Sequence, residues 1–204
     1  MNAFVLVVLS QFPMDVFDNA AAFKEFDHGN YGVLSKREVK GSPYPEHRIV
    51  VTTETPAPVL CDAVFEMGTS GDTDGLALHK SLRDDGDVRV VYEQLAIPVV
   101  SNRDYAMTVA RWPKLEGGKC RIRFRATNDV APELPKGYVR MDKLWGEWFF
   151  EPQEDGKTRI TYTMFSDPAG SVPPFLVQGS LVKAVKDSVL KALARGKAAA
   201  EKKK

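Results

Sequence analysis

Cysteine, histidine and net charge are all scarce in this sequence. Its 204 residues include two cysteines and three histidines, and 28 basic residues against 27 acidic ones leave a formal net charge of +1. A charge so close to zero gives no global electrostatic reason to expect nucleic acid as a partner. Cys61 and Cys120 stand far apart and form no metal-binding pattern. We expect both to be buried as small apolar residues rather than joined in a disulfide.

Sequence patterns that would indicate catalysis are also missing. His28, His47 and His79 are separated from one another, and their spacing is not that of a zinc site. The sequence has no Gly-x-Ser-x-Gly elbow, no Cys-x-x-Cys pair and no glycine-rich phosphate loop. We therefore expect no bound metal, no cofactor and no catalytic residues.

Hydrophobic runs long enough to cross a membrane are absent as well. The apolar run at the N-terminus, Ala3 to Leu9, is far shorter than the about 20 residues that a membrane-spanning helix needs. It also lacks the basic flank of a signal peptide. Residues 1–13 are interpreted as an apolar segment, either a trimmed signal or an extension packed on the domain. We expect a cytoplasmic protein, or a periplasmic or secreted one if a signal was removed.

The sequence does contain a long amphipathic stretch near its C-terminus. It runs from Phe175 to about Gly196, and apolar residues recur in it at helical spacing: Val177, Leu181, Val182, Val185, Val189 and Leu193. Ser171 suits an N-cap, and Pro173 and Pro174 suit the first turn. The pattern predicts a helix about 30 Å long, which needs one broad apolar surface to lie on.

Alternating patterns elsewhere predict strands that can supply this surface. A helix is predicted over 14–26 and another over about 55–67, and the strands are expected at 32–39, 47–53, 79–83, 88–97, 104–112, 119–127, 137–151 and 158–165. Asp-Gly steps at Asp85-Gly86 and Asp155-Gly156 indicate hairpin turns.

One strand shows how the two faces of the sheet should differ. Three arginines, at positions 121, 123 and 125, alternate with Ile122, Phe124 and Ala126, which predicts a polar face and an apolar face. The expected class is α+β, a single domain over 14–196 followed by a disordered basic tail, 197–204.

Four stretches resemble the START lipid-transfer domains. They are Val91-Tyr92-Glu93-Gln94, Val99 to Tyr105, Gly146 to Pro152, and Asp167-Pro168-Ala169-Gly170 followed by Pro173. The Arg-Asp-aromatic step at 103–105 and the Asp-Pro-x-Gly before the last helix are the most specific, and the resemblance covers about 17–196. It implies the helix-grip fold, a curved antiparallel sheet wrapped around the long C-terminal helix. It also implies an internal hydrophobic cavity that takes one sterol, phospholipid or similar lipid.

Strand alternation indicates which residues would line that cavity. Arg103, Tyr105, Met107 and Val109 share one face of their strand, and Glu93 and Leu95 pair beside them. The full predicted site is Glu93, Leu95, Arg103, Tyr105, Met107, Val109, Ile122, Phe124, Trp148, Tyr162, Met164, Leu181, Val185 and Val189.

The two charged members of this set need partners if they are buried. A buried carboxylate or guanidinium is costly unless it is paired, so we expect Glu93 and Arg103 to pair with each other or to contact the ligand. A solvated position for Glu93 and a structural salt bridge at the sheet edge for Arg103 are the alternatives. In sterol carriers of the resembled family, a buried Glu matching Glu93 faces an arginine, whose position is taken here by Val109.

The resemblance implies a carrier that binds one lipid and touches membrane surfaces transiently. We also expect a monomer that binds no nucleic acid. Exchange would need the loop 98–102 or the start of the last helix to open, and lysines of the basic tail would favour anionic headgroups. Two alternatives stay open. One is a polyketide cyclase or aromatase-like enzyme of the same fold, using Glu93 with Tyr92 or Tyr105. The other is a ligand-sensing scaffold domain.

Overall fold

The computed structural model describes residues 21–71, 75–97, 100–170 and 172–202. Its main helices are α2 (Ala57–Thr69) and α3 (Pro174–Glu201), and two short 3-10 turns are η1 (Glu116–Gly118) and η2 (Asn128–Val130). The strands are β1 (Lys24–Gly29), β2 (Gly32–Arg37), β3 (Glu46–Thr53), β4 (Leu76–Asp84), β5 (Val88–Leu95), β6 (Asn102–Trp112), β7 (Cys120–Ala126), β8 (Tyr138–Arg140), β9 (Leu144–Pro152) and β10 (Thr158–Ser166). The predicted segment 1–13 lies outside the described residues.

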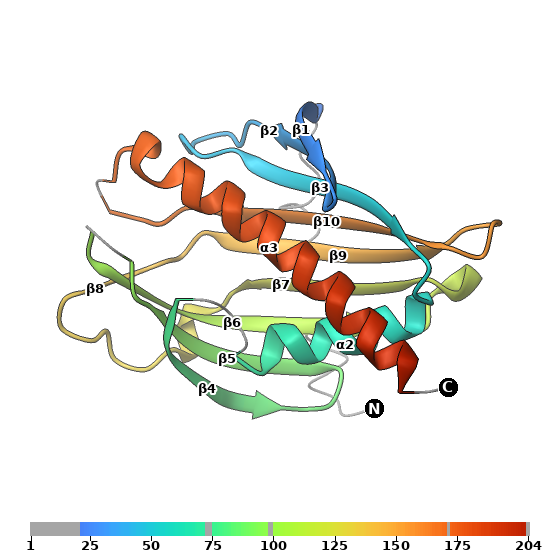
Figure 1. The fold of residues 1–204 in the computed structure, drawn as a ribbon. Helices are drawn as coiled ribbons and strands as arrows, with labels where there is room; N and C mark the ends of the chain where they lie inside the picture. Colours follow the sequence, from blue (N-terminus) through green and yellow to red (C-terminus); the bar gives the residue numbers. More distant parts are fainter. Residues whose placement is uncertain (1–20, 72–74, 98–99, 171, 203–204) are drawn as a thin grey trace.

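The strands form one antiparallel sheet that curves around α3. Their order is β1-β2-β3-β10-β9-β7-β6-β5-β4, and β8 adds a short parallel pairing to β6. Gly86 and Gly156 adopt the positive φ values that their hairpin turns require, 78° and 82°. Figure 1 shows α3 crossing the sheet, with α2 beside its C-terminal half. The expected α+β class and the helix-grip architecture are confirmed.

Three segment predictions were wrong. Lys24 and Glu25 were expected at the end of a helix, but they pair with Lys36 and Ser35 in the β1–β2 ladder. Strand pairing here overrides local periodicity. The part of the predicted helix before residue 21 lies outside the described residues. The single strand expected over 137–151 is divided into β8 and β9. The tail was expected to be disordered from residue 197, but α3 continues to Glu201 through three alanines that favour helix.

A disulfide joins α2 to the sheet. Cys61 and Cys120 are bonded, with Cα atoms 6.2 Å apart, so the expectation of two unpaired thiols was wrong. Both side chains are buried, as expected. They meet because α2 packs against the inner face of β7, a contact between distant parts of the sequence that its spacing does not reveal.

The two halves of α3 are held very differently. From Val185 onward, Val185, Val189 and Ala192 are buried in the main core cluster. Gly196 allows close contact with α2, because a Cβ there would collide with the side chain of Leu60. From Pro174 to Ala184, by contrast, only Val177 is buried. The C-terminal half therefore anchors the helix. In the described part of the chain, neither α3 nor α2 is both long and apolar enough to cross a membrane.

Strand β6 is buried on both of its faces. Tyr105, Met107 and Val109 face the core as predicted, but Asp104, Ala106, Thr108 and Ala110 on the opposite face are buried too. The segment around η2 and β8 covers that second face: Asn128 accepts a hydrogen bond from the Ala106 amide, and Arg140 forms an ion pair with Asp104 at 2.5 Å. The predicted polar face is therefore present along β7 but not along β6.

Candidate ligand-binding site

Most of the predicted cavity residues lie together between the sheet and α3. One buried cluster contains Tyr105, Met107, Val109, Ile122, Trp148, Tyr162, Val185 and Val189, and Leu95, Phe124 and Met164 pack against it with part of their surface accessible. Leu181 lies apart, in a smaller cluster with Tyr44, Phe165 and Val177. The structure thus brings together an apolar inner wall from β5, β6, β7, β9, β10 and α3.

Aromatic rings form the centre of this wall. The rings of Trp148 and Tyr162 stack with centroids 3.8 Å apart and planes 15° from parallel. On the neighbouring strands, the Phe124 ring lies over Gly146, where a Cβ would collide with it. Burial raises the pKa of the Tyr162 hydroxyl, which therefore remains protonated and can donate a hydrogen bond. The wall is apolar, with a small number of polar groups.

Glu93 is the most conspicuous of these polar groups. It is only 3% exposed, and it accepts a hydrogen bond from the Tyr105 hydroxyl at 2.5 Å. Its other oxygen lies 3.1 Å from His79 Nδ1. Burial and the charge of Glu93 both raise the pKa of Tyr105, so the hydroxyl stays protonated as the donor. The alternative of a solvated Glu93 was wrong.

Sequence reasoning missed His79. The β4–β5 ladder places His79 directly opposite Glu93, and Tyr105 lies opposite Glu93 on the other side. The Asp-Gly turn at 85–86 was recognised as joining these two strands. Counting residues outward from the turn does not locate the pair reliably, because the ladder shifts register between Ser81 and Arg83.

Arg103 does not pair with Glu93. Its side chain is 1% exposed and donates hydrogen bonds to three backbone carbonyls: Pro168 at 2.8 Å, Ala169 at 3.2 Å, and Ser101. The alternative of a salt bridge at the sheet edge was also wrong. Arg103 instead ties β6 to the loop that leads into α3.

The Asp-Pro-x-Gly stretch is this loop, and its own contacts fix its shape. Asp167 accepts hydrogen bonds from the Ala169 amide at 3.0 Å and from the Ser42 hydroxyl at 3.3 Å. Ala169 has a φ of 57°, which is unusual for a residue other than glycine. The Tyr44 hydroxyl donates to the Val172 carbonyl at 2.7 Å. These contacts hold the chain just before α3 begins.

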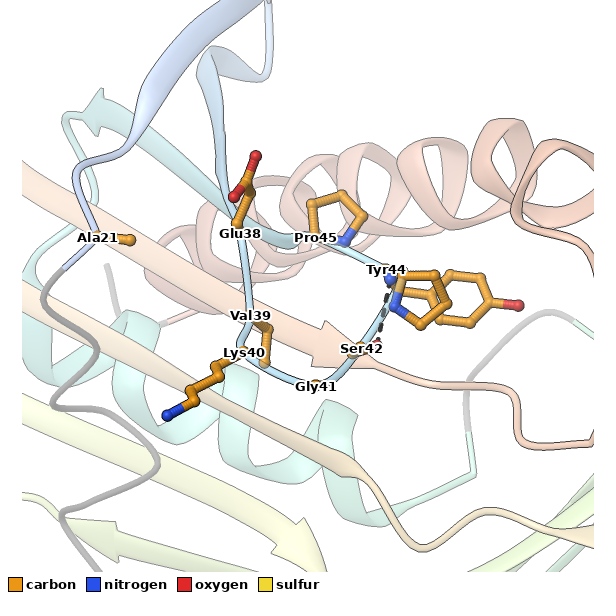
Figure 2. A pocket seen from close by; sticks show the side chains of 9 residues that line it. Ala21, Glu38, Val39, Lys40, Gly41, Ser42, Tyr44 and Pro45 are labelled. Atoms are coloured by element: carbon orange, nitrogen blue, oxygen red, sulfur yellow. Dashed lines mark hydrogen bonds between the residues drawn. The ribbon is translucent and has the colours of Figure 1, made fainter.

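A surface hollow of about 620 Å³ lies at the β2–β3 connection (Figure 2). It is lined by Ala21 and by residues 38–45. Figure 2 shows the Lys40 side chain extending away from the loop, while the Ser42 hydroxyl accepts from the Tyr44 amide. This hollow contains none of the predicted site residues.

His47 is buried on the inner face of β3, opposite Met164 of β10. Burial, with a smaller contribution from Lys36, lowers its pKa from 6.5 to about 4. Its folded form therefore stays neutral at pH 5, where the unfolded chain binds a proton.

This difference predicts a pH-dependent stability. Between pH 7 and pH 5 the unfolded chain takes up more protons at His47 than the folded chain does. The free energy of unfolding therefore falls by about 2 kcal/mol as the pH falls. Urea unfolding at the two pH values measures the loss. A His47→Gln variant should show a pH dependence smaller by about that amount. An equal dependence in both proteins would contradict the assignment to His47.

The comparisons with known proteins agree with this geometry. The model of the START domain matches residues 71–202. An uncharacterized protein of Pseudomonas aeruginosa is 30% identical over 168 residues, which cover 80% of this chain and 79% of that protein.

Solved structures show the same fold. A STAR-related lipid transfer protein of Xanthomonas axonopodis (fragment 25–204) has 28% identity and a TM-score of 0.66, covering 84% of this chain and 96% of that one. Human StAR-related lipid transfer protein 5, at 17% identity, covers 95% of both chains with a TM-score of 0.74 and shows a likeness of fold alone. An aromatase/cyclase is among the further fold neighbours. The chain therefore belongs to the START domain family.

Proposed function

We propose that this protein binds one lipid molecule between the inner wall and α3 and carries it between membranes without changing it chemically. Membership of the START family supports lipid binding in general. The observation that carries the proposal is the polar cluster of buried Glu93 and Tyr105 with the partly exposed His79, at the edge of an otherwise apolar wall. A site of this kind binds by apolar burial and orients its ligand through a few polar contacts.

The polar groups favour a neutral headgroup that can donate a hydrogen bond. The Glu93 carboxylate has lone pairs left to accept from a ligand hydroxyl, as a sterol would offer, and it would repel a phosphate brought into the same buried space. Arg103, the buried cation nearest along the wall, already donates to three carbonyls. We therefore place sterol-like lipids ahead of anionic phospholipids.

Cargo exchange requires part of the structure to open. Residues 174–184 of α3 include a single buried residue, Val177, while the rest of the helix is anchored on the core and on α2. We propose that the first turns of α3 move aside during exchange and that the carrier works as a monomer in transient contact with membranes, without nucleic acid. The Cys61–Cys120 disulfide favours an oxidising compartment, periplasmic or secreted, over the cytoplasm that was expected from the N-terminal sequence.

Native mass spectrometry of the purified protein, followed by lipid extraction, tests the proposal directly. We expect one bound lipid per chain and transfer of that lipid between vesicles. A protein that takes up no lipid from vesicles of mixed composition, sterol included, would contradict it.

The role of Glu93 can be tested separately. Glu93→Gln keeps an acceptor for the Tyr105 hydroxyl but removes the charge, so affinity for a hydroxyl-bearing lipid should fall about tenfold, because hydrogen bonds to charged groups are worth about 1.5–3 kcal/mol. Titration with a fluorescent sterol measures it. Glu151→Gln, a half-buried carboxylate on the outer face of β9, is the matched control and should bind normally. Equal affinity in both variants would exclude Glu93 as a headgroup contact.

A further inference from the structure

Two large apolar side chains project into solvent at the start of α3. Phe175 is 78% exposed, the highest value for a large apolar side chain in the described part of the chain, and its neighbour Leu176 is 49% exposed. Neighbouring residues of a helix point about 100° apart, so these two side chains cover the outward side of the first turn, while Val177 in the same turn is buried. Val177 lies in a core cluster with Tyr44 and Phe165, and Leu181 packs against that cluster one turn later.

The sequence on either side of this pair contains no charged residue. The whole stretch from Pro168 to Val182 contains no Asp, Glu, Lys, Arg or His. Its exposed members beyond the apolar pair are small or uncharged, such as Gln178 and Ser180. Contact through this turn would therefore rest on apolar insertion rather than on attraction between charges.

The pair also stands where cargo would pass. Arg103 connects the loop before α3 to Ser101, at the end of the β5–β6 connection. Figure 1 shows the start of α3 and this connection at the same end of the molecule. The first turns of α3 are also the weakly held part of the helix. Phe175 and Leu176 therefore lie on the part of α3 that would move. A surface that binds these two side chains could help the site to open.

The size of the patch decides between a bilayer and a second copy of the chain. A stable protein interface buries about 800 Å² on each partner, whereas a fully buried aromatic side chain supplies about 150–250 Å². Phe175 and Leu176 together fall well short of the area needed for a dimer. A bilayer needs only side chains that can pass between headgroups into the acyl region.

We propose that Phe175 and Leu176 insert into the bilayer and dock the protein with the start of α3 against the membrane. The inference rests on the proposed carrier function and adds the residues that touch the membrane. Docking of this kind depends on neither anionic lipid nor low salt, because the inserted turn carries no charge.

The test compares the F175S/L176S double variant with the wild type. We expect flotation with phosphatidylcholine vesicles and the rate of lipid transfer to fall at least fivefold, while the lipid bound per chain stays the same. Leu82→Ser is the matched control: Leu82 is 39% exposed on β4, near the β4–β5 turn at the opposite end, and its loss should change neither quantity. Flotation of the wild type should change less than twofold between 0.05 and 0.5 M salt. The Debye length falls from about 14 to about 4 Å over this range, so binding by charge attraction would weaken much more.

A labelled variant gives a second measurement. The sequence has only two cysteines and both are in the disulfide, so Phe175→Cys introduces a single free thiol. A polarity-sensitive dye attached there should brighten on adding vesicles, and the same dye at Leu82→Cys should not.

Each outcome bears on one of the two proposals. If the double variant floats with vesicles and transfers lipid as well as the wild type does, membrane docking by this pair is overturned and the carrier function is unaffected. A wild type that floats through these residues but takes up no lipid would overturn the carrier function instead. Binding that requires anionic lipid, or a concentration-dependent dimer that the double variant abolishes, would also overturn bilayer insertion.

Discussion

Replacing Arg103 with methionine is expected to lower the free energy of unfolding by about 4 kcal/mol. The variant keeps most of the side-chain volume but loses three hydrogen bonds from a buried cation to the carbonyls of Ser101, Pro168 and Ala169. Such bonds are worth about 1.5–3 kcal/mol each, and the removed desolvation of the guanidinium offsets part of the sum. The loop before α3 is left with unsatisfied buried acceptors. Urea unfolding measures the difference.

Arg125→Met provides the control for this substitution. Arg125 is half-buried on the outer face of β7, and its Nε donates to the Ala126 carbonyl at a long 3.5 Å, so its replacement should change stability by less than about 0.5 kcal/mol. Arg103→Lys should fall between the two, because lysine keeps the charge without the planar geometry of the guanidinium. Equal stability of the Arg103 and Arg125 methionine variants would show that the three carbonyl contacts contribute nothing.

Removal of the disulfide should have a comparable effect for a different reason. Cys61 and Cys120 are separated by 59 positions, and closing a loop of this length removes about 4 kcal/mol of conformational entropy from the unfolded chain at 25 °C. The C61A/C120A variant should therefore unfold at a lower urea concentration. The folded contacts between α2 and β7 remain, so the fold itself should persist.

Reduction supplies the control for the disulfide. Adding dithiothreitol should lower the stability of the wild type, once the bond is reduced in the unfolded state, and leave the double alanine variant unchanged. Thiol titration of the denatured wild type should find no free thiol before reduction and two after it. Free thiols in the unreduced protein would show that the bond does not form.

The parts of the fold with a regular pattern were predictable from the sequence. The apolar spacing in α3 gave its position, because one stripe must face the sheet. The alternation of Arg121 to Ala126 identified the inner face of β7, and alternation in β6 placed Tyr105, Met107 and Val109 on the core side. These predictions rest on periodicity, which depends only on local geometry.

The contacts that define the site could not be predicted in this way. Arg103 was placed on the inner face correctly, but two of its three partners are backbone carbonyls of a loop at least 65 positions away. Pairing of Cys61 with Cys120 depends on how α2 lies on the sheet, and the place of His79 beside Glu93 depends on a register shift in β4. Such contacts are set by the tertiary arrangement, for which one sequence carries no local signal.

Because α3 is anchored unequally, substitutions in its two parts should affect folding differently. Substitutions in the half that packs on α2 act on folding, because Val189 and Gly196 are closely enclosed. Phe175, Leu176, Gln178, Gly179 and Ser180 are exposed, so substitutions at these positions should leave folding nearly unaffected, whereas Val177 is buried in the cluster with Tyr44 and Phe165. If the protein acts as the proposed carrier, substitutions at these exposed positions should change its contact with membranes without loss of the folded scaffold.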